Sequence, residues 1–558
     1  MLHKCRNSHK FFSFIFVIIS FLAFAGSAHA VDYYVATTGS DSNPGTQAAP
    51  WGSFSYAIPK LNPGDTLFLK NGIYNSSGHL IKVNCGQHSE SSAAKNAKSG
   101  VAGSPITIKA ESERQAAFHS DGDGDAIVIM TGCSHWTIEG LTFKTQDKDN
   151  GKKTVGGSFL IYHSDHIKIR RNLIYNSNRY NPNTTILLNY VNDSLVEENE
   201  TYDYLGHVIN NKYGDNNVFR RNYSNPRGRT GLGNYYDDGN GPGPSKPGAL
   251  LTIYPGRNLI VENNIAEGTN VFVDTQTIKQ TENIKSLGNI SLNTRWHALL
   301  SRRPMENPGA GTVNFYFEND ISVDPRLVGI TARGSTNVIV NHFSVFGNSR
   351  GVDNYKGIVA DKGARTAEFG VSPLPLSIHV KNSLITKIDG FANYFVDQDG
   401  GFSVDHTNLF NNSKDFYPLS SPTYTNNINK DPGLGSCKVF IPDSSPMKGA
   451  GTGGGDIGAN ILCRYENGTL TQTQLWNWET GQFPCGAIVP GVNNIAGSSC
   501  SDVHKRLNVN TNGCNLPATP SCKQPAPPNF PPIPIGGGGS GLPPILKGPN
   551  GEVCPSGF

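Results

Sequence analysis

Two short stretches of the chain concentrate side chains that can do chemistry, and in the first of them acidic and aromatic residues stand together. Asp237 and Asp238 precede a Gly-Asn pair, so their carboxylates stand on a flexible turn, which Ca²⁺ accepts as a source of oxygen ligands. Tyr235 and Tyr236 come directly before them and can stack on sugar rings, and Lys246 follows as a candidate base. The alternative is a solvated loop in which the Asp residues only form turns.

The second stretch is basic and aromatic. It contains Arg295, Trp296 and His297, followed closely by Arg302 and Arg303. An indole ring beside several guanidinium groups suits a sugar polymer that carries carboxylates, because Arg binds carboxylates through paired hydrogen bonds. The structural alternative is a basic loop that packs the apolar stems of its Arg residues against the scaffold.

Both stretches interrupt a repeat in which an apolar residue is followed by two polar residues and then by Asn. The clearest copies are Ile169–Asn172, Val196–Asn199, Phe219–Asn222 and Val261–Asn264. The steps between their Asn residues are 27, 23 and 42, and such a period with insertions is typical of solenoids. A short strand in each copy, closed by Asn-rich turns, predicts an all-β fold of the parallel β-helix type. Asn tolerates the left-handed conformation of such corners, and stacked amides can hydrogen-bond between coils.

The position two residues before the Asn changes charge from one copy to the next. In five successive copies it is occupied by Glu139, Arg170, Glu197, Arg220 and Glu262. Stacked in register, each charge would lie between two opposite charges at cross-strand distance. This pattern predicts a structural ion-pair ladder and favours a structural over a catalytic role for its two Arg residues.

Residues 1–30 are predicted to be a signal peptide, because basic residues precede an apolar run and residues 28–30 form a small-x-small cleavage site. The chain has 47 basic and 44 acidic residues, and removing Lys4, Arg6 and Lys10 leaves 44 of each. A neutral chain does not favour a nucleic-acid partner. No later stretch is apolar enough for a transmembrane segment. We therefore expect a secreted or cell-surface protein, whose 63 Gly and 35 Pro suit a turn-rich β fold.

Cysteines and composition divide the remainder of the chain. The β-helix is expected over residues 31–460, a Cys-containing cap region over 461–522, and a Pro- and Gly-rich disordered tail over 523–558. Nine Cys remain after signal removal, and in an exported chain we expect them to form disulfides. The odd number leaves one thiol over, for which Cys554 in the tail is the candidate.

Three segments make the chain resemble a known group. These are YYVATTGSDSNPGTQAAPWGSFSYAIPKLNPGDTLFLKNGIY, GSPITIKAES and HWTIEGLTF, within residues 33–144. They resemble the opening of secreted right-handed β-helix proteins and are similar to the start of polysaccharide lyases that act on pectate, alginate or chondroitin. The resemblance implies a right-handed solenoid with a short N-terminal capping helix near residues 54–61, and it continues as a general coil resemblance to about residue 460.

The resemblance also implies an activity, namely β-eliminative cleavage of a uronate-containing glycan. Such enzymes neutralise the uronate carboxylate, often with Ca²⁺, while a Lys or Arg removes the proton at C5. On this hypothesis Asp237 and Asp238 bind Ca²⁺, Lys246 or Arg302 is the base, and Arg303 pairs with the carboxylate. Tyr235 and Tyr236, with Arg295, Trp296 and His297, would contact the glycan.

The characteristic motifs of the individual lyase families are absent, as are the Asp pairs and the Gly-His-Gly segment of polygalacturonases. The alternative function is therefore a non-catalytic glycan-binding, adhesin or matrix protein, for which the neutral charge and the Cys-terminated tail also speak. A glycoside hydrolase is a third possibility, which requires a suitably spaced carboxylate pair.

Overall fold

The computed structural model of the protein describes most of the chain between Ala30 and Trp476. The described residues are 30–75, 79–86, 94–120, 126–145, 158–175, 184–204, 206–226, 248–276, 280–301, 311–347, 355–361, 376–396, 401–417, 423–435, 438–476 and 507. All of them belong to one structural unit, residues 1–524. The predicted signal peptide, apart from Ala30, and the predicted tail lie outside the described residues.

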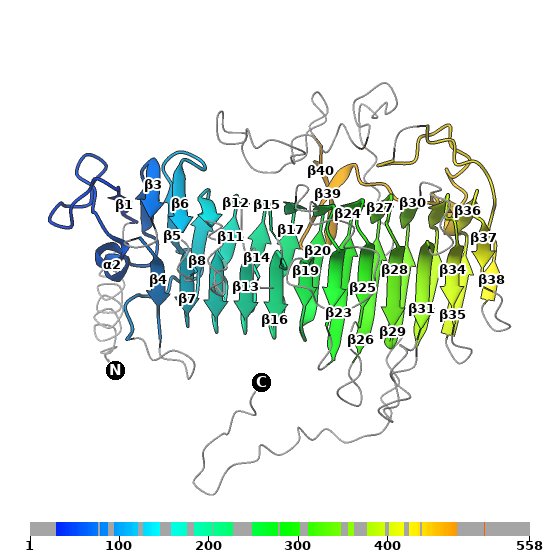
Figure 1. Ribbon diagram of the computed structural model, residues 1–558, viewed down its shortest axis with the longest axis horizontal. Helices are drawn as coiled ribbons and strands as arrows, with labels where there is room; N and C mark the ends of the chain where they lie inside the picture. The colour runs from blue at the N-terminus through cyan, green and yellow to red at the C-terminus, as the bar shows by residue number, and fades with distance from the viewer. Residues whose placement is uncertain are drawn as a thin grey trace, which may run out of the picture. The chain divides into compact units, whose positions relative to one another are not determined.

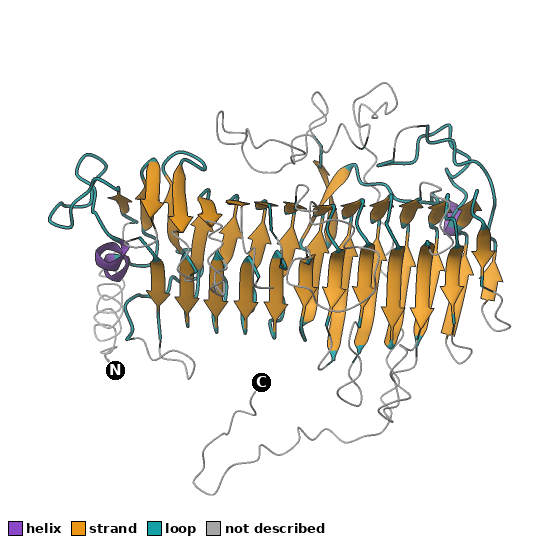
Figure 2. Ribbon diagram, in the orientation of Figure 1, coloured by secondary structure: helices purple, strands orange, loops and turns teal. Residues whose placement is uncertain are grey.

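The described chain winds through three parallel sheets in turn, which we name A, B and C (Figure 1). Sheet A has 14 strands, and sheets B and C have 12 strands each. From β2 onward, neighbours in each sheet are three strands apart in the chain, as where β11 pairs with β8 and with β14. Strands make up nearly all of the regular structure (Figure 2). The predicted parallel β-helix is confirmed.

The strands have the following bounds. Sheet A consists of β1 Asp32–Val35, β2 Thr66–Leu69, β5 Ile106–Ala110, β8 Trp136–Glu139, β11 Lys168–Arg170, β14 Leu195–Glu197, β17 Val218–Arg220, β20 Arg257–Glu262, β23 Thr281–Leu287, β26 Thr312–Glu318, β29 Ser335–Asn341, β32 Ser377–Lys381, β35 Gly401–Asp405 and β38 Thr423–Thr425. Sheet B consists of β3 Gly72–Asn75, β6 Ala116–Ser120, β9 Thr142–Thr145, β12 Leu173–Tyr175, β15 Glu200–Tyr202, β18 Tyr223–Asn225, β21 Ile265–Glu267, β24 Ile290–Leu292, β27 Ile321–Val323, β30 Ser344–Phe346, β33 Leu384–Thr386 and β36 Asn408–Phe410. Sheet C consists of β4 Ile81–Asn84, β7 Val128–Thr131, β10 Phe159–Tyr162, β13 Ile186–Asn189, β16 Ile209–Lys212, β19 Ala249–Ile253, β22 Val271–Thr275, β25 Trp296–Leu300, β28 Val328–Arg333, β31 Lys356–Asp361, β34 Phe391–Phe395 and β37 Lys414–Phe416.

The helical elements are short. They are α2 Phe54–Ala57 and the 3-10 turns η1 Ile58–Lys60 and η3 Thr452–Gly454. The side chain of Ser53 caps α2 by accepting a hydrogen bond from the backbone N–H of Tyr56. Phe54 packs inward against Tyr74 and Phe118 at the start of the solenoid. The capping helix predicted near residues 54–61 is therefore present. Within the described chain, no helical segment combines the length and apolar character that a membrane span requires.

The buried Asn residues of the repeat form a hydrogen-bonded ladder. Each amide of Asn172, Asn199 and Asn222 donates to the side-chain oxygen of its counterpart one coil later, with Nδ2–Oδ1 distances of 3.0 Å. The ladder continues through Asn264 to Asn289. The left-handed corner conformation belongs instead to the residue before each Asn, which has φ between 51° and 59° in residues 171, 198, 221 and 263. The predicted stacking of amides is confirmed. The left-handed conformation expected for Asn is not adopted by these buried Asn residues, but it is adopted at other corners, as by Asn216 and Asn258.

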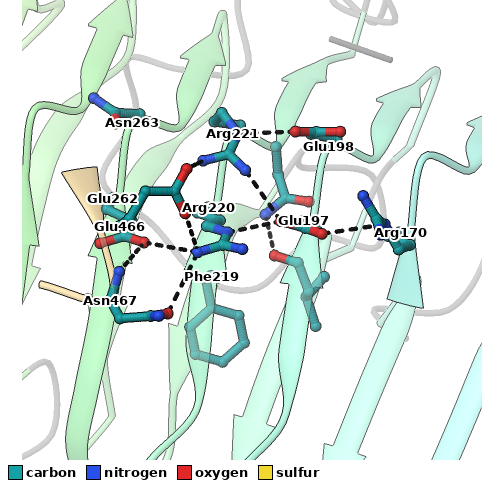
Figure 3. Close-up of polar contacts among 12 residues, drawn as sticks. Arg170, Glu197, Glu198, Phe219, Arg220, Arg221, Glu262, Asn263, Glu466 and Asn467 are labelled. Atoms are coloured by element: carbon teal, nitrogen blue, oxygen red, sulfur yellow. Dashed lines mark hydrogen bonds and ion pairs between the residues drawn. The ribbon is translucent and has the colours of Figure 1, made fainter. Parts of the chain in front are cut away.

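The alternating charges form the predicted ion-pair ladder (Figure 3). Arg170 lies 3.1 Å from Glu197, and Arg220 lies 2.7 Å from Glu197 and 3.6 Å from Glu262. Burial raises the pKa of Glu197, but the three neighbouring guanidinium groups outweigh burial and hold that pKa below its ordinary value. For Glu262 burial dominates and raises the pKa, because only one Arg faces it, at the longer distance. The two Arg residues are thus structural, as the sequence pattern indicates.

The segment after the last coil turns back along the outer face of sheet B. The backbone N–H groups of Gly458, Ala459 and Asn460 donate to residues 382, 344 and 319, so the chain retraces earlier coils in reverse order. Its apolar residues, among them Ile457, Ile461 and Trp476, form a second core with outward-facing residues of sheet B. The returning segment therefore covers one face of the solenoid.

A hairpin ends this returning segment and locks onto the charge ladder. Its strands are β39 Cys463–Glu466 and β40 Thr469–Gln474. Glu466 contacts Arg220 and lies 2.8 Å from Arg221, and the backbone N–H of Asn467 donates to Glu262 (Figure 3). The ion-pair ladder thus connects Arg220 with Glu466, two residues separated by almost half the length of the chain.

Disulfides occur at the start of the solenoid and in the returning segment. Cys85 is bonded to Cys133, which closes a loop 48 residues long at the start of the solenoid. Cys463 is also disulfide-bonded, to a partner outside the described residues. The expectation of disulfides is confirmed for these three Cys.

Candidate functional site

Most of the predicted site residues lie outside the described residues. These are Tyr235, Tyr236, Asp237, Asp238, Lys246, Arg302 and Arg303. The described ends of their segments are nevertheless informative, because residues 227–247 lead into β19 and residues 302–310 leave from the end of β25. Only β22 separates β19 from β25 in sheet C. Both predicted constellations are therefore attached to sheet C, but at opposite edges, because the strands are parallel and one segment precedes a strand whereas the other follows one.

The structure separates the three described residues of the second constellation. The Arg295 guanidinium lies 4.5 Å from the Trp296 ring centroid, and both side chains are half-buried at the start of β25. His297 is fully buried within the coil, where it contacts Ser291 at 2.9 Å and Asp320 at 3.2 Å. An imidazole in this position cannot reach a glycan, so the prediction for His297 is corrected to a role inside the core.

The outer face of sheet C has an unusual spacing, which explains why Trp296 and His297 differ. In β19 both Leu250 and Leu251 belong to the central core, which breaks the two-residue alternation of a strand. Ala249, Val271 and Leu299 instead form a separate cluster with Trp296 outside the coil. Outward positions here are three residues apart.

At the last coils this spacing places three aromatic rings and two Lys residues together on the outer face of sheet C. We name Phe391, Tyr394, Tyr417, Lys356 and Lys414 the sheet C patch. The centroid of the Tyr394 ring lies 5.3 Å from that of Phe391 and 4.6 Å from that of Tyr417. The Lys356 amine lies 4.9 Å from the Tyr394 ring, and that of Lys414 lies 5.0 Å from the Phe391 ring. Burial lowers the pKa of Lys356.

The sheet C patch and Trp296 share one face of the solenoid. The strand register pairs Trp296 with Val328, and Val328 with Lys356. Adjacent strands are roughly 4.8 Å apart, so the backbones of Trp296 and Lys356 are about 10 Å apart along the solenoid axis. A polymer lying along the axis would therefore pass from the Arg295–Trp296 pair to the patch without leaving sheet C.

The other outer faces are less suited to a polymer. The returning C-terminal segment buries the outward side chains of sheet B, including Tyr223 and Ile265. On sheet A, the edge beside sheet B carries the ion-pair ladder, whose charges are already paired with one another. We therefore place the candidate site on sheet C.

A further row of rings follows the corner between sheets C and A. His163, Tyr190 and Tyr213 stack on successive coils with centroid distances of 4.9 Å. Lys212 lies 5.7 Å from the Tyr213 ring. This row also runs along the axis, and Tyr190 is exposed.

The sequence signals for the sheet C patch are weak. Phe391 and Tyr394 are three residues apart, so the pair does not match the two-residue period of an ordinary strand. Lys356 and Lys414 join them only through the register of β31, β34 and β37. A second charge ladder was not predicted, although the repeat shows it as pairs of adjacent like charges. In this ladder Arg171 lies 3.0 Å from Glu113, and Arg221 lies 2.9 Å from Glu198.

Comparison with known proteins identifies the type of solenoid. Residues 33–226 match the family described as Pel9A-like, right handed beta helix region, which confirms the resemblance read from the sequence. No curated protein sequence matches the chain.

Among solved structures, the PL6 family alginate lyase AlyGC is similar with a TM-score of 0.50 and 13% identity. That match covers 78% of this chain and 59% of the lyase, so the chain spans little more than half of that enzyme's length. The pectate lyase Pel9A matches with a TM-score of 0.40 and 16% identity, over 78% of this chain and 96% of that one. A PL6 family polysaccharide lyase from Pseudopedobacter saltans matches with a TM-score of 0.45 and 14% identity, over 68% and 91%. At 13% identity the likeness to AlyGC shows the fold alone: a right-handed parallel β-helix.

Proposed function

We propose that this protein is exported, binds an acidic polysaccharide along the outer face of sheet C, and cleaves it by β-elimination. The observation that carries the proposal is the sheet C patch, in which aromatic rings and Lys amines alternate on one open face. The family match over residues 33–226 supports a polysaccharide as the ligand class.

The patch has the two properties that an acidic glycan requires. The faces of Phe391, Tyr394 and Tyr417 offer apolar surface for the C–H side of sugar rings. Lys356 and Lys414 offer positive charge for uronate carboxylates. Because both kinds of group occur along the same direction, successive sugars of one chain can use them in turn.

Cleavage requires a base at the C5 proton of a uronate and positive charge at its carboxylate. The base removes that proton, the C4–O bond to the leaving sugar breaks, and a C4–C5 double bond forms. In this proposal Lys246 or Arg302 is the base and Arg303 pairs with the carboxylate, since their segments attach to sheet C. A Ca²⁺ ion held by Asp237 and Asp238 would add positive charge at that carboxylate. The lowered pKa of Lys356 gives this amine a larger neutral fraction, so it is an additional candidate base.

The binding step is tested by electrophoresis of the mature chain through gels that contain polygalacturonate, alginate, chondroitin sulfate or a neutral glucan. Retardation by an acidic polymer is expected, and Tyr394→Ala should weaken it by about fivefold in affinity, because a ring contact contributes about 1 kcal/mol. Tyr56→Ala is the matched control: Tyr56 is an exposed ring that also carries a Lys amine, 4.2 Å away, but it lies in the N-terminal cap. Equal retardation of both variants would place the binding site elsewhere.

A second function is binding without cleavage, as in an adhesin or matrix protein. The sheet C patch also supports this second function, because aromatic rings and amines can bind a glycan without cleaving it. Release of unsaturated products separates the two functions, because β-elimination creates a double bond and binding does not.

A further inference from the structure

The corner between sheets C and A carries a second, exposed amide ladder. The residues of this ladder have a left-handed backbone. Asn258 donates to Asn216 at 3.1 Å, and Asn283 donates in turn to Asn258 at 3.1 Å. The ladder continues through two later coils at 2.8 and 2.7 Å. Its first member is Asp193, which accepts from Asn216 at 3.0 Å.

The two coils before Asp193 replace the amide with imidazole. His166 and His135 occupy the same corner position, with φ of 52° and 55°, and their rings stack with centroids 4.3 Å apart. Two stacked imidazoles cannot reproduce the donor–acceptor chain of the Asn residues. The ladder thus ends in two imidazoles, which do not extend its chain of hydrogen bonds but are common metal ligands.

Asp165 completes a set of three ligands. Its Oδ1 lies 2.7 Å from Nδ1 of His166, and its Oδ2 accepts a hydrogen bond from the Ser134 hydroxyl at 2.8 Å. One ligand atom each from His135, Asp165 and His166 lies within 4.8 Å of the others. A carboxylate held by a second hydrogen bond beside a His ring is the usual way in which proteins orient metal ligands.

The backbone holds these ligands in place before any ion arrives. The N–H of Asp165 donates to the carbonyl of Cys133 at 3.0 Å, and the N–H of His135 donates to the carbonyl of Asp165 at 3.2 Å. Cys133 is in turn bonded to Cys85, so the corner is fixed covalently as well. Little ordering is therefore left for binding to impose.

A pocket of about 480 Å³ adjoins the cluster. It is lined by His135 and His166, by Lys168 on the coil of His166, by Asp193 on the next coil, and by the loop at residues 101–105. A metal ion with three protein ligands keeps positions open, and this pocket supplies room for a water or a ligand oxygen at those positions.

We propose that His135, Asp165 and His166 form an open binding site for a divalent transition-metal ion. Two imidazoles and one carboxylate select zinc, copper or nickel, whereas Ca²⁺ takes oxygen ligands. This site is independent of the proposed Ca²⁺ ligands and of the sheet C patch.

The test is titration of the chelator-treated mature protein with Zn²⁺ by calorimetry, repeated for His135→Gln, His166→Gln and the double variant. Each single variant should lose at least about tenfold in affinity at one site, and the double variant should bind one ion fewer. His406→Gln is the matched control, because His406 also lies beside a carboxylate, 2.8 Å from Asp405, on the same solenoid, but among the described residues it belongs to no group of three candidate ligands.

A spectroscopic readout separates this site from adventitious binding elsewhere. Electron paramagnetic resonance of one equivalent of Cu²⁺ should show coupling to two imidazole nitrogens in the wild type and to one in His135→Gln. Unchanged stoichiometry and spectrum in the double variant, or an equal loss in His406→Gln, would overturn the proposal. Circular dichroism of each variant verifies that it is folded.

Discussion

The buried Asn ladder makes a quantitative prediction about how the solenoid is stabilised. Asn222 lies in the middle of the ladder and is 2% exposed. Its amide donates to the Val196 carbonyl at 2.8 Å and to Asn264 at 3.0 Å. Its oxygen accepts from the backbone and the side chain of Asn199, at 3.1 and 3.0 Å. Asn222→Ala removes all four hydrogen bonds and leaves four buried polar groups without those partners.

The expected cost follows from this count. At about 1 kcal/mol for each lost bond, Asn222→Ala lowers the free energy of unfolding by about 4 kcal/mol. The control is Asn283→Gly on the exposed ladder, where two amide hydrogen bonds are lost. Asn283 has φ of 56°, which Gly adopts without strain, and water can replace the lost partners, so the control should cost less than about 1 kcal/mol.

Urea unfolding of the mature chain, followed by tryptophan fluorescence, measures both values. Trp136 and Trp476 are fully buried and report on the N-terminal coils and on the returning segment. A fall in the midpoint at constant slope gives the change in stability. If Asn222→Ala and Asn283→Gly shift the midpoint equally, burial of the ladder is not what makes it stabilising, and the reasoning fails.

Three further predictions concern the ladder, the disulfide and the returning segment. Glu197→Gln should destabilise the fold by about 3 kcal/mol at neutral pH, because Glu197 is a buried partner of several Arg residues. The pKa of Glu197 is lower in the folded than in the unfolded protein, so the stabilisation from its carboxylate is present above the unfolded pKa and is lost as the pH falls through the folded pKa. Plots of the free energy of unfolding against pH for the variant and the wild type should therefore converge below pH 4.5. Cys85→Ser with Cys133→Ser should cost about 4 kcal/mol from the entropy of a 48-residue loop, measured by the same urea titration, and a loss below about 1 kcal/mol would contradict it. Glu466→Gln should increase hydrogen exchange in residues 463–474 because it weakens the contacts with Arg220 and Arg221, whereas exchange unchanged from the wild type would show that apolar packing alone holds the hairpin.

The sequence predicted those features that depend on local repetition. Parallel coils, the amide stack and the charge alternation all follow from residues that recur at matching positions, as Glu197 and Arg220 do. The capping helix near Phe54 was likewise predictable from its own residues. The register that pairs Lys168 with Leu195 could then be inferred, because a shift by one residue would turn every apolar side chain outward.

Other features depend on contacts between distant parts of the chain. The return of residues 438–476 along sheet B has no periodic signal, because one face of an irregular segment packs on strands from many coils. The burial of His297 follows from the break in alternation at β25, which brings two consecutive side chains toward the core. The grouping of His135 with His166 required knowing that both occupy the same corner, and their separation of 31 residues reflects an insertion between coils.

The central claim is that the protein cleaves an acidic glycan by β-elimination. It is tested most directly by ultraviolet absorbance during incubation of the purified mature protein with polygalacturonate, alginate and glycosaminoglycans, each with Ca²⁺ and with chelator. We predict a rising absorbance from the new C4–C5 double bond with one of these polymers, suppressed by chelator and reduced in Asp237→Ala with Asp238→Ala. A flat trace with all three polymers, from protein shown to be folded and to bind one of them, would contradict cleavage and leave binding alone as the function.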